Sequence, residues 1–277
     1  MGMDTNYISE NEFTQIVNLL KSRYGINLSQ KKNLIVGRLH NYIVRSNFDS
    51  FTDFYNYVVN DKSGDALTLL VNKLTTNYTY FLRETEHFDF FKSTVLPHIV
   101  STEKSRDMRI WSAGCSSGEE PYSIAMYLDD YFGHSKSGWD TKILATDISE
   151  RVLEQAAEGV YLTESIEPLP QAWRGKYFNT LDAEHSQVCD RLRGEIIFRK
   201  FNLMERYLPF RKKFHIIWCR NVMIYFDSKT KHDLVERFYD ATEEGGYLFI
   251  GHSESILRTE TRYNYVKPAI YRKEPQK

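Results

Sequence analysis

Cysteine is scarce in this chain of 277 residues: Cys115, Cys189 and Cys219 lie far apart. Their spacing matches no paired metal-ligand motif, so we predict no metal site, and a sparse, odd count is typical of free thiols in a reducing cytosol. The chain also lacks a long apolar run, and its first residues are polar and acidic. These features argue against a membrane-spanning helix and a signal peptide, so we expect a soluble, cytoplasmic protein without membrane insertion.

Basic residues are not in excess either: the chain has 36 Lys and Arg and 37 Asp and Glu, which gives a net charge of -1. This balance argues against nucleic acid as a general partner. No internal repeat or low-complexity segment is present, and short polar surface runs favour a monomer. With 42% hydrophobic residues, the chain can bury the core of one large domain or two unequal ones.

Hydrophobic periodicity divides the chain into two regions. From about residue 8 to 95 apolar residues recur at helical spacing, which predicts an all-α domain and linker over residues 1–92. After about residue 105, β-rich runs alternate with helical ones, which predicts an α/β domain over 93–277 with a mainly parallel sheet and helices on both faces. A long partly aromatic interval at about 160–200 breaks the alternation and predicts an inserted subdomain. The expected strands are 108–112, 141–146, 195–199, 214–219, 246–251 and 269–272.

The segment from Arg109 to Tyr122 is the most informative motif: an apolar strand, a turn of small residues, then a helix that opens with Glu119 and Glu120. Such a turn lets a ligand approach bare backbone. A pyrophosphate needs amide donors and positive dipole there, and two carboxylates would repel it. They would instead accept hydrogen bonds from ribose hydroxyls or attract a cationic cofactor, which favours S-adenosylmethionine over NAD.

Other polar residues also follow predicted strands, where ligands bind on parallel sheets. Asp147 follows the second strand, in the usual place of a ribose-hydroxyl acceptor. It also precedes a predicted helix, so the alternative is a helix cap. The loop Arg220–Phe226 resembles in position the catalytic loop of nucleic-acid amino methyltransferases, but it lacks their Pro-Pro pair, which disfavours an amine substrate. Tyr225 lies within this loop, and the alternative to a functional role is that it is an ordinary core aromatic.

Two features of the first region also suggest binding. The linker 75–84 is aromatic and carries Arg83, which predicts the wall of a pocket; the alternative is a packed hinge in which Arg83 pairs with Glu84 or Glu86. On the second predicted helix, about 30–45, Lys31, Arg38 and Arg45 recur every seven residues and form a basic stripe. The stripe is either a solvated face or a docking surface for an acidic helical partner.

Four long motifs together resemble the bacterial chemotaxis receptor methyltransferases of the CheR type. They are 76–84 (TNYTYFLRE), 111–123 (WSAGCSSGEEPYS), 219–226 (CRNVMIYF) and 251–254 (GHSE), in the same order as in that family. The resemblance covers nearly the whole chain. It implies a Rossmann-like class I methyltransferase sheet, an N-terminal helical domain and an inserted antiparallel β subdomain.

The resemblance also implies the activity: transfer of a methyl group from S-adenosylmethionine to glutamate side chains on the cytoplasmic helical bundle of chemoreceptors, leaving S-adenosylhomocysteine. Arg83 and Tyr225 would stand beside the transferring methyl. Some members bind a receptor pentapeptide through a Gly-rich loop of the inserted subdomain; residues 179–187 hold no glycine, which argues against such a tether. By motif position, the cofactor would be bound by Asn77, Thr79, Arg83, Glu120, Asp147, Asn202, Leu203, Arg220 and Asn221.

Two other functions remain open on the residues alone. One is methylation of a nucleic-acid base or ribose, against which stand the net charge and the missing Pro-Pro pair. The other is a non-catalytic adaptor that binds the cofactor to control a partner. The presence of both Arg83 and Tyr225 argues for an enzyme.

Overall fold

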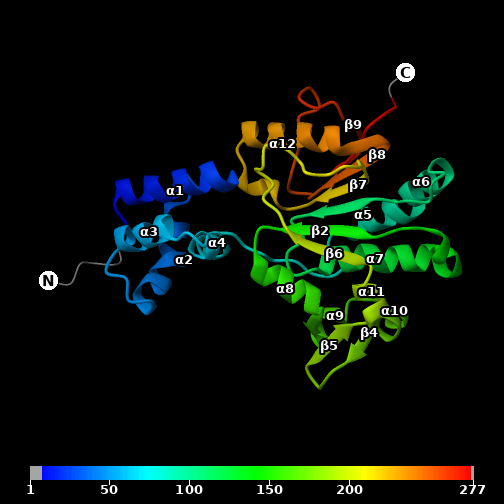
Figure 1. Ribbon diagram of the computed structural model, residues 1–277, viewed down its shortest axis with the longest axis horizontal. Helices are drawn as coiled ribbons and strands as arrows, with labels where there is room; N and C mark the ends of the chain where they lie inside the picture. Colours follow the sequence, from blue (N-terminus) through cyan, green and yellow to red (C-terminus); the bar gives the residue numbers. More distant parts are fainter. Residues whose placement is uncertain (1–7, 276–277) are drawn as a thin grey trace. The chain divides into compact units, whose positions relative to one another are not determined.

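The computed structural model describes residues 8–275, which form two compact units (Figure 1). The helical unit comprises residues up to Asn77 together with Tyr225–Thr230, and the sheet unit comprises Tyr78–Ile224 and the chain from Lys231 onward. The helix that begins at Thr85 is thus grouped with the sheet, whereas the sequence pattern grouped it with the helices before it. The expected division between residues 92 and 93 stays a prediction.

Each helix of the helical unit buries one apolar stripe, as the periodicity predicted. The first helix begins with a capping box between Ser9 and Glu12. It ends at Gly25, which adopts the left-handed conformation expected of a helix C-cap. A returning segment completes the unit: Ile26 bridges to Phe226, and Lys21 pairs with Asp227 at 2.8 Å. The helices are α1 (Glu10–Tyr24), α2 (Lys32–Arg45), α3 (Phe51–Asn60) and α4 (Asp65–Leu74).

A mixed seven-stranded sheet organises the sheet unit, in the order β6-β2-β1-β7-β8-β10-β9. The first five strands in this order are parallel, and β10 runs antiparallel between β8 and β9. The six strands expected from the sequence are present, 214–219 with the expected bounds and the other five with shifted ends. β9 was missed because its residues are largely exposed and show no apolar run. The strands are β1 (Ile110–Ala113), β2 (Ile143–Asp147), β6 (Ile196–Lys200), β7 (Phe214–Cys219), β8 (Thr242–Ile250), β9 (Asn264–Lys267) and β10 (Ile270–Arg272).

Helices cover both faces of this sheet. In a parallel pair, residues in register share a face, so Ser112 and Trp218 point to one side and Trp111 to the other. Phe88 stacks on Trp218, and Phe238 packs edge-on against Trp111. Phe88 belongs to α5 (Thr85–Phe90) and Phe238 to α12 (Ser228–Ala241). The other helices before the insertion are η1 (Phe91–Val95), α6 (Leu96–Thr102), α7 (Glu119–Phe132), η2 (Gly133–Gly138) and α8 (Glu150–Glu158); η3 (Met223–Tyr225) follows β7.

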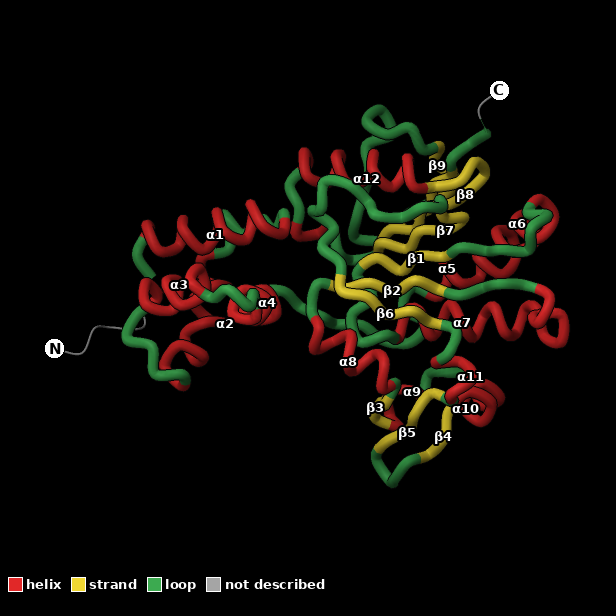
Figure 2. The backbone as a smooth tube through the Cα atoms, viewed as in Figure 1, coloured by secondary structure: helices red, strands yellow, loops and turns green. Residues whose placement is uncertain are grey.

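The interval that broke the alternation is a small antiparallel subdomain, which confirms the predicted insertion. Its three strands pair in the order β3-β5-β4 and form a group separate from the large sheet (Figure 2). The hairpin between β4 and β5 contains no glycine and is closed by Asp182, whose carboxylate accepts hydrogen bonds from the Glu184 and His185 N–H groups. Its elements are β3 (Val160–Leu162), α9 (Thr163–Ile166), α10 (Gln171–Tyr177), β4 (Phe178–Thr180), β5 (His185–Val188) and α11 (Asp190–Arg193).

The helices of residues 8–275 are too short or too polar to cross a bilayer.

Candidate active site

Four adjacent parallel strands, β6, β2, β1 and β7, end at the same edge of the sheet. Asn202 follows β6, Asp147 is the last residue of β2, Glu120 opens the helix after β1, and Arg220 follows β7. Because ligands of such sheets bind beyond the carboxyl ends of the strands, this edge is the candidate site. The fold therefore brings together the polar residues that the sequence placed after separate strands.

The turn between β1 and α7 requires glycine at two positions. Gly114 and Gly118 have φ values of 92° and 99°, in the left-handed region that residues with a Cβ rarely adopt. A Cβ on Gly114 would come within 2.3 Å of Val222 Cγ2. A Cβ on Gly118 would lie 2.9 Å from both Ala156 Cβ and Tyr161 Oη. The small residues thus serve close packing of the turn, and they also leave its backbone bare.

Asp147 joins this turn to the next helix. One carboxylate oxygen accepts a hydrogen bond from the Ser116 N–H at 3.0 Å, and the other accepts from the Ser149 N–H at 3.0 Å. The N-cap residue of α8 is Ser149 rather than Asp147. Burial raises the pKa of Asp147, although these N–H groups oppose the shift. The helix-cap alternative therefore holds only in part: Asp147 accepts a hydrogen bond from the Ser149 N–H but is not itself the N-cap. A ribose contact at Asp147 stays a proposal.

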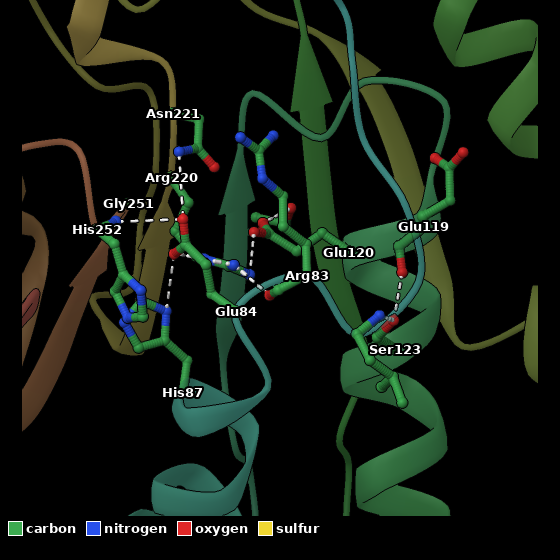
Figure 3. Close-up of polar contacts among 12 residues, drawn as sticks. Arg83, Glu84, His87, Glu119, Glu120, Ser123, Arg220, Asn221, Gly251 and His252 are labelled. Atoms are coloured by element: carbon green, nitrogen blue, oxygen red, sulfur yellow. Dashed lines mark hydrogen bonds and ion pairs between the residues drawn. The ribbon is translucent and has the colours of Figure 1, made fainter. Parts of the chain in front are cut away.

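Arg220 lies between two carboxylates (Figure 3). Its Nη1 is 3.2 Å from Glu120 Oε2, and its Nη2 is 3.1 Å from Glu84 Oε2. The same guanidinium donates to the Arg83 carbonyl, and Ser112 Oγ donates to Glu120 Oε1 at 2.7 Å. The Arg220 side chain is only 2% exposed. Burial raises the pKa of Glu120 in spite of Arg220, whereas in Glu84 the charge of Arg220 and the hydrogen bonds outweigh burial and lower the pKa.

The environment of Arg83 differs from the one that the packed-hinge alternative predicts. Its Nη1 donates to the Tyr78 carbonyl at 2.8 Å, and its guanidinium lies within 6 Å of the Tyr78 and Tyr80 ring centres. Among the described residues, the acceptor of this hydrogen bond is the Tyr78 carbonyl, and not the carboxylate of Glu84 or Glu86 that the packed hinge would pair with Arg83. Both neighbours of Arg83, Leu82 and Glu84, have φ of 58°. Such strained backbone is often found at functional sites, and here it holds an arginine beside two aromatic rings.

The fourth motif, residues 251–254, stabilises the third, residues 219–226, through hydrogen bonds to Glu254. Glu254 Oε2 accepts hydrogen bonds from the N–H groups of Asn221 at 2.9 Å and Gly251 at 2.6 Å. Asn221 has φ of 59°, and a Cβ on Gly251 would come within 2.4 Å of Asn221 Nδ2. Glu254 thus fixes the backbone from which Asn221 projects. In the sequence Glu254 belongs to the fourth motif, but nothing in its residue type or spacing predicted this role.

Glu84 and His87 were also missed as site residues. Glu84, His87 and His252 offer ligand atoms within 4.8 Å of one another, the one group of metal-ligand type found among residues 8–275. However, Glu84 Oε2, which faces His87 Nδ1 at 3.4 Å, is the same oxygen that contacts Arg220. A divalent cation there would lie close to a fixed positive charge, so we assign no metal to this group.

The remaining predicted residues are distributed between the two units. Thr79 lies in the sheet unit, Leu203 is buried there, and Asn202 Oδ1 accepts from the Met204 N–H at 3.0 Å. Asn77 and Tyr225 belong to the helical unit. Tyr225 is half-buried rather than a core aromatic, and its hydroxyl accepts a hydrogen bond from the Thr76 N–H at 3.0 Å.

The basic stripe is less uniform than the heptad spacing predicted. Lys31 is the N-cap of α2 and precedes the helix, which corrects its placement on the helix itself. Arg38 is half-buried and donates to the Leu74 carbonyl at 2.9 Å and to Thr76 Oγ1 at 2.7 Å. Arg45 is exposed in the last turn. A docking role for these three residues stays a proposal.

The chemistry of the edge fits a cationic adenosyl donor better than a dinucleotide. Glu119, Glu120 and Asp147 surround the turn, and burial raises the pKa of each carboxyl group. Buried carboxylates of one sign favour a positively charged ligand and disfavour a pyrophosphate. Glu119 accepts a hydrogen bond from Ser117 Oγ, so the two acids that open α7 have separate partners.

Comparison with known proteins agrees with this geometry. Residues 77–271 match the family model "CheR methyltransferase, SAM binding domain", and residues 11–75 match "CheR methyltransferase, all-alpha domain". A chemotaxis protein methyltransferase of Borreliella burgdorferi is 42% identical over 96% of this chain and 95% of its own. Similar proteins from Vibrio cholerae and Escherichia coli are 33% and 32% identical over 95% of this chain and 91% of theirs. The chain belongs to the CheR family of S-adenosylmethionine-dependent methyltransferases.

Proposed function

We propose that this protein methylates glutamate side chains on the cytoplasmic helical bundle of chemoreceptors. The relatives support a chemotaxis role, since each is named as a chemotaxis protein methyltransferase. The single observation that carries the chemical assignment is the anionic edge of the sheet, where Glu84 and Glu120 both contact Arg220. Such an edge suits a donor that carries a positive charge.

The acceptor chemistry needs no general base. A glutamate with a pKa of about 4.3 is ionised near pH 7 and can attack without losing a proton. One histidine at this edge, His87, is a poor proton acceptor, because burial and the charge of Arg220 lower its pKa to about 3. When bound, S-adenosylmethionine supplies an electrophilic methyl group on a sulfonium. The protein must then bring carboxylate and methyl into line, which can contribute roughly 7–11 kcal/mol.

Each predicted site residue has a place in this scheme. We assign Arg83 to the acceptor, because a guanidinium held over two rings can donate a charge-assisted hydrogen bond to a carboxylate. Tyr225 would orient the same carboxylate through its hydroxyl. The donor would be held by Asn77, Thr79, Glu120, Asp147, Asn202, Leu203, Arg220 and Asn221.

The partner surfaces are proposed with the same function. The stripe Lys31, Arg38 and Arg45 would dock the acidic face of a receptor helix. The hairpin between β4 and β5 lacks the glycines of a pentapeptide-binding loop, so we propose that receptors are recognised without that tether. We propose that the protein acts as a monomer in the cytoplasm.

A base-lability assay tests the function. The protein is incubated with tritiated S-adenosylmethionine and a receptor cytoplasmic fragment, and the labelled product is treated with mild base. A glutamate methyl ester releases volatile labelled methanol, and we expect most of the label to be released. Base-stable label on the fragment, label on added nucleic acid, or binding without transfer would contradict the proposal.

A further inference from the structure

The turn between β1 and α7 is strained and has to be held by its surroundings. Gly114, Ser116 and Gly118 all have positive φ, and Ser116, at 50°, carries a Cβ that makes this conformation unfavourable. Such backbone persists only where neighbouring groups over-determine it. The end of β2 holds the first part of the turn, because the Gly114 N–H donates to the Thr146 carbonyl at 2.8 Å and the Ser116 N–H donates to Asp147 at 3.0 Å.

The last part of the turn is held from the inserted subdomain. Tyr161, in β3, is 6% exposed, and its hydroxyl donates a hydrogen bond to the Ser117 carbonyl at 2.6 Å. The same oxygen would lie 2.9 Å from a Cβ on Gly118, so it stands directly against the turn backbone. The insertion breaks the strand–helix alternation of the chain, and yet it contacts the backbone at the strand-end edge of the large sheet.

The ring of Tyr161 is fixed by packing that is separate from its hydroxyl. It meets the Phe81 ring edge-on with 4.9 Å between ring centres, and Phe81 meets Phe178 of β4 at 5.5 Å. All three rings are buried. The next residue of the linker, Leu82, donates its N–H to Ser123 Oγ of α7 at 3.1 Å. Because the ring is held by these contacts, Tyr161→Phe should keep the packing and remove only the hydrogen bond to the turn.

We propose that Tyr161 is a positioning residue whose hydroxyl holds the end of the turn in the conformation that binds S-adenosylmethionine. The inserted subdomain thereby takes part in cofactor binding. Without the hydroxyl the strained turn relaxes in part of the molecules, and the apparent affinity falls with the fraction that stays competent to bind. The net contribution of one hydrogen bond corresponds to about a fivefold change in that equilibrium.

Calorimetry on two matched variants tests this role. The control is Tyr177→Phe, because Tyr177 is also a buried tyrosine of the subdomain, and its hydroxyl donates to Asp129 Oδ2 at 3.0 Å near the other end of α7. Each variant removes one hydroxyl contact with α7 or the turn before it, so both should melt at a lower temperature. We expect Tyr161→Phe to bind S-adenosylmethionine and S-adenosylhomocysteine about fivefold more weakly, and Tyr177→Phe to bind both as wild type does. Wild-type affinity in Tyr161→Phe, or an equal loss in both variants, would overturn the proposal.

Amide hydrogen exchange on the unliganded protein gives a second measurement. The Gly118 N–H donates to the Cys115 carbonyl at 3.1 Å within the turn, so its exchange reports how often the turn opens. Exchange at Gly118 should be faster in Tyr161→Phe than in wild type or Tyr177→Phe. Unchanged exchange there would show that the hydroxyl does not hold the turn and would overturn the proposal. Neither measurement involves a methyl acceptor, so both are independent of whether glutamate is methylated.

Discussion

The Asp147 carboxylate accepts a hydrogen bond from the Ser116 N–H at 3.0 Å, which joins the end of β2 to the turn after β1. If Asp147 also binds the cofactor ribose, Asp147→Asn should weaken S-adenosylhomocysteine binding by roughly 1.5–3 kcal/mol, the usual contribution of a charge-assisted hydrogen bond. Calorimetry measures the affinity, and Glu150→Gln, at the exposed start of α8, is the control. Unchanged affinity would leave Asp147 with only its role in the turn and helix start.

Gly118→Ala should destabilise the protein and weaken cofactor binding. The left-handed conformation costs a residue with a Cβ roughly 1–2 kcal/mol, and here the Cβ also meets Ala156 and Tyr161. Gly175→Ala is the matched control, because Gly175 lies within α10 and its Cβ would meet nothing within 4 Å. We expect Gly175→Ala to gain about 0.5–1 kcal/mol. Thermal melts of both variants decide this, and an undiminished melting temperature for Gly118→Ala would contradict the argument.

Arg83→Ala should lose most methyl transfer, because the proposed donor to the acceptor carboxylate is removed. The fold should persist, because the guanidinium donates to a backbone carbonyl and packs only on partly exposed rings. Arg83→Lys keeps the charge but not the planar donor pair, so we expect partial activity. Turnover on a receptor fragment is measured beside the melting temperature. Near-normal turnover in Arg83→Ala would remove Arg83 from the mechanism.

His87 makes the protein sensitive to acid. Its pKa is about 3 in the folded state, mainly because of burial, and about 6.5 when exposed. Between these values the unfolded chain binds more protons, so stability is lost as the pH falls below about 6.5. The loss between pH 7 and 5 is about 2 kcal/mol at full effect. His87→Phe fits the aromatic surroundings of Trp218 and Phe249 and should flatten this loss, as measured by melting at both pH values. An equal loss in wild type and variant would exclude His87 as the cause.

Charge reversal of the basic stripe should impair methylation of a receptor fragment and leave cofactor affinity unchanged. Arg45→Glu and Lys31→Glu are the clean variants, since both residues are exposed. Arg38→Glu should also lower stability, because Arg38 bonds to the Leu74 carbonyl and Thr76. We expect a raised KM for the fragment with little change in kcat. If methylation by Arg45→Glu and Lys31→Glu equals that of wild type, the stripe is only a solvated face.

Much of this architecture was accessible from sequence, because helical and strand periodicities are local. The turn at Gly114–Gly118 and the acid at Asp147 were recognisable from residue type and order alone. The Glu84–Arg220 pair was not, because its members lie 136 positions apart in the sequence and only the fold brings them together. Glu84 had a local interpretation as a partner of its neighbour Arg83, and this hid its contacts with later motifs. Likewise β9 carries no apolar pattern, because its residues are largely exposed at the edge of the sheet.

The helical unit is assembled from two pieces of chain, residues up to Asn77 and Tyr225–Thr230. The second piece contributes a backbone hydrogen bond from the Asn27 N–H to the Tyr225 carbonyl and the pairing of Asp227 with Lys21. A chimera that exchanges only the N-terminal segment for that of a relative would therefore mismatch this seam. Exchanging the helical unit between family members therefore calls for transplanting both pieces at once.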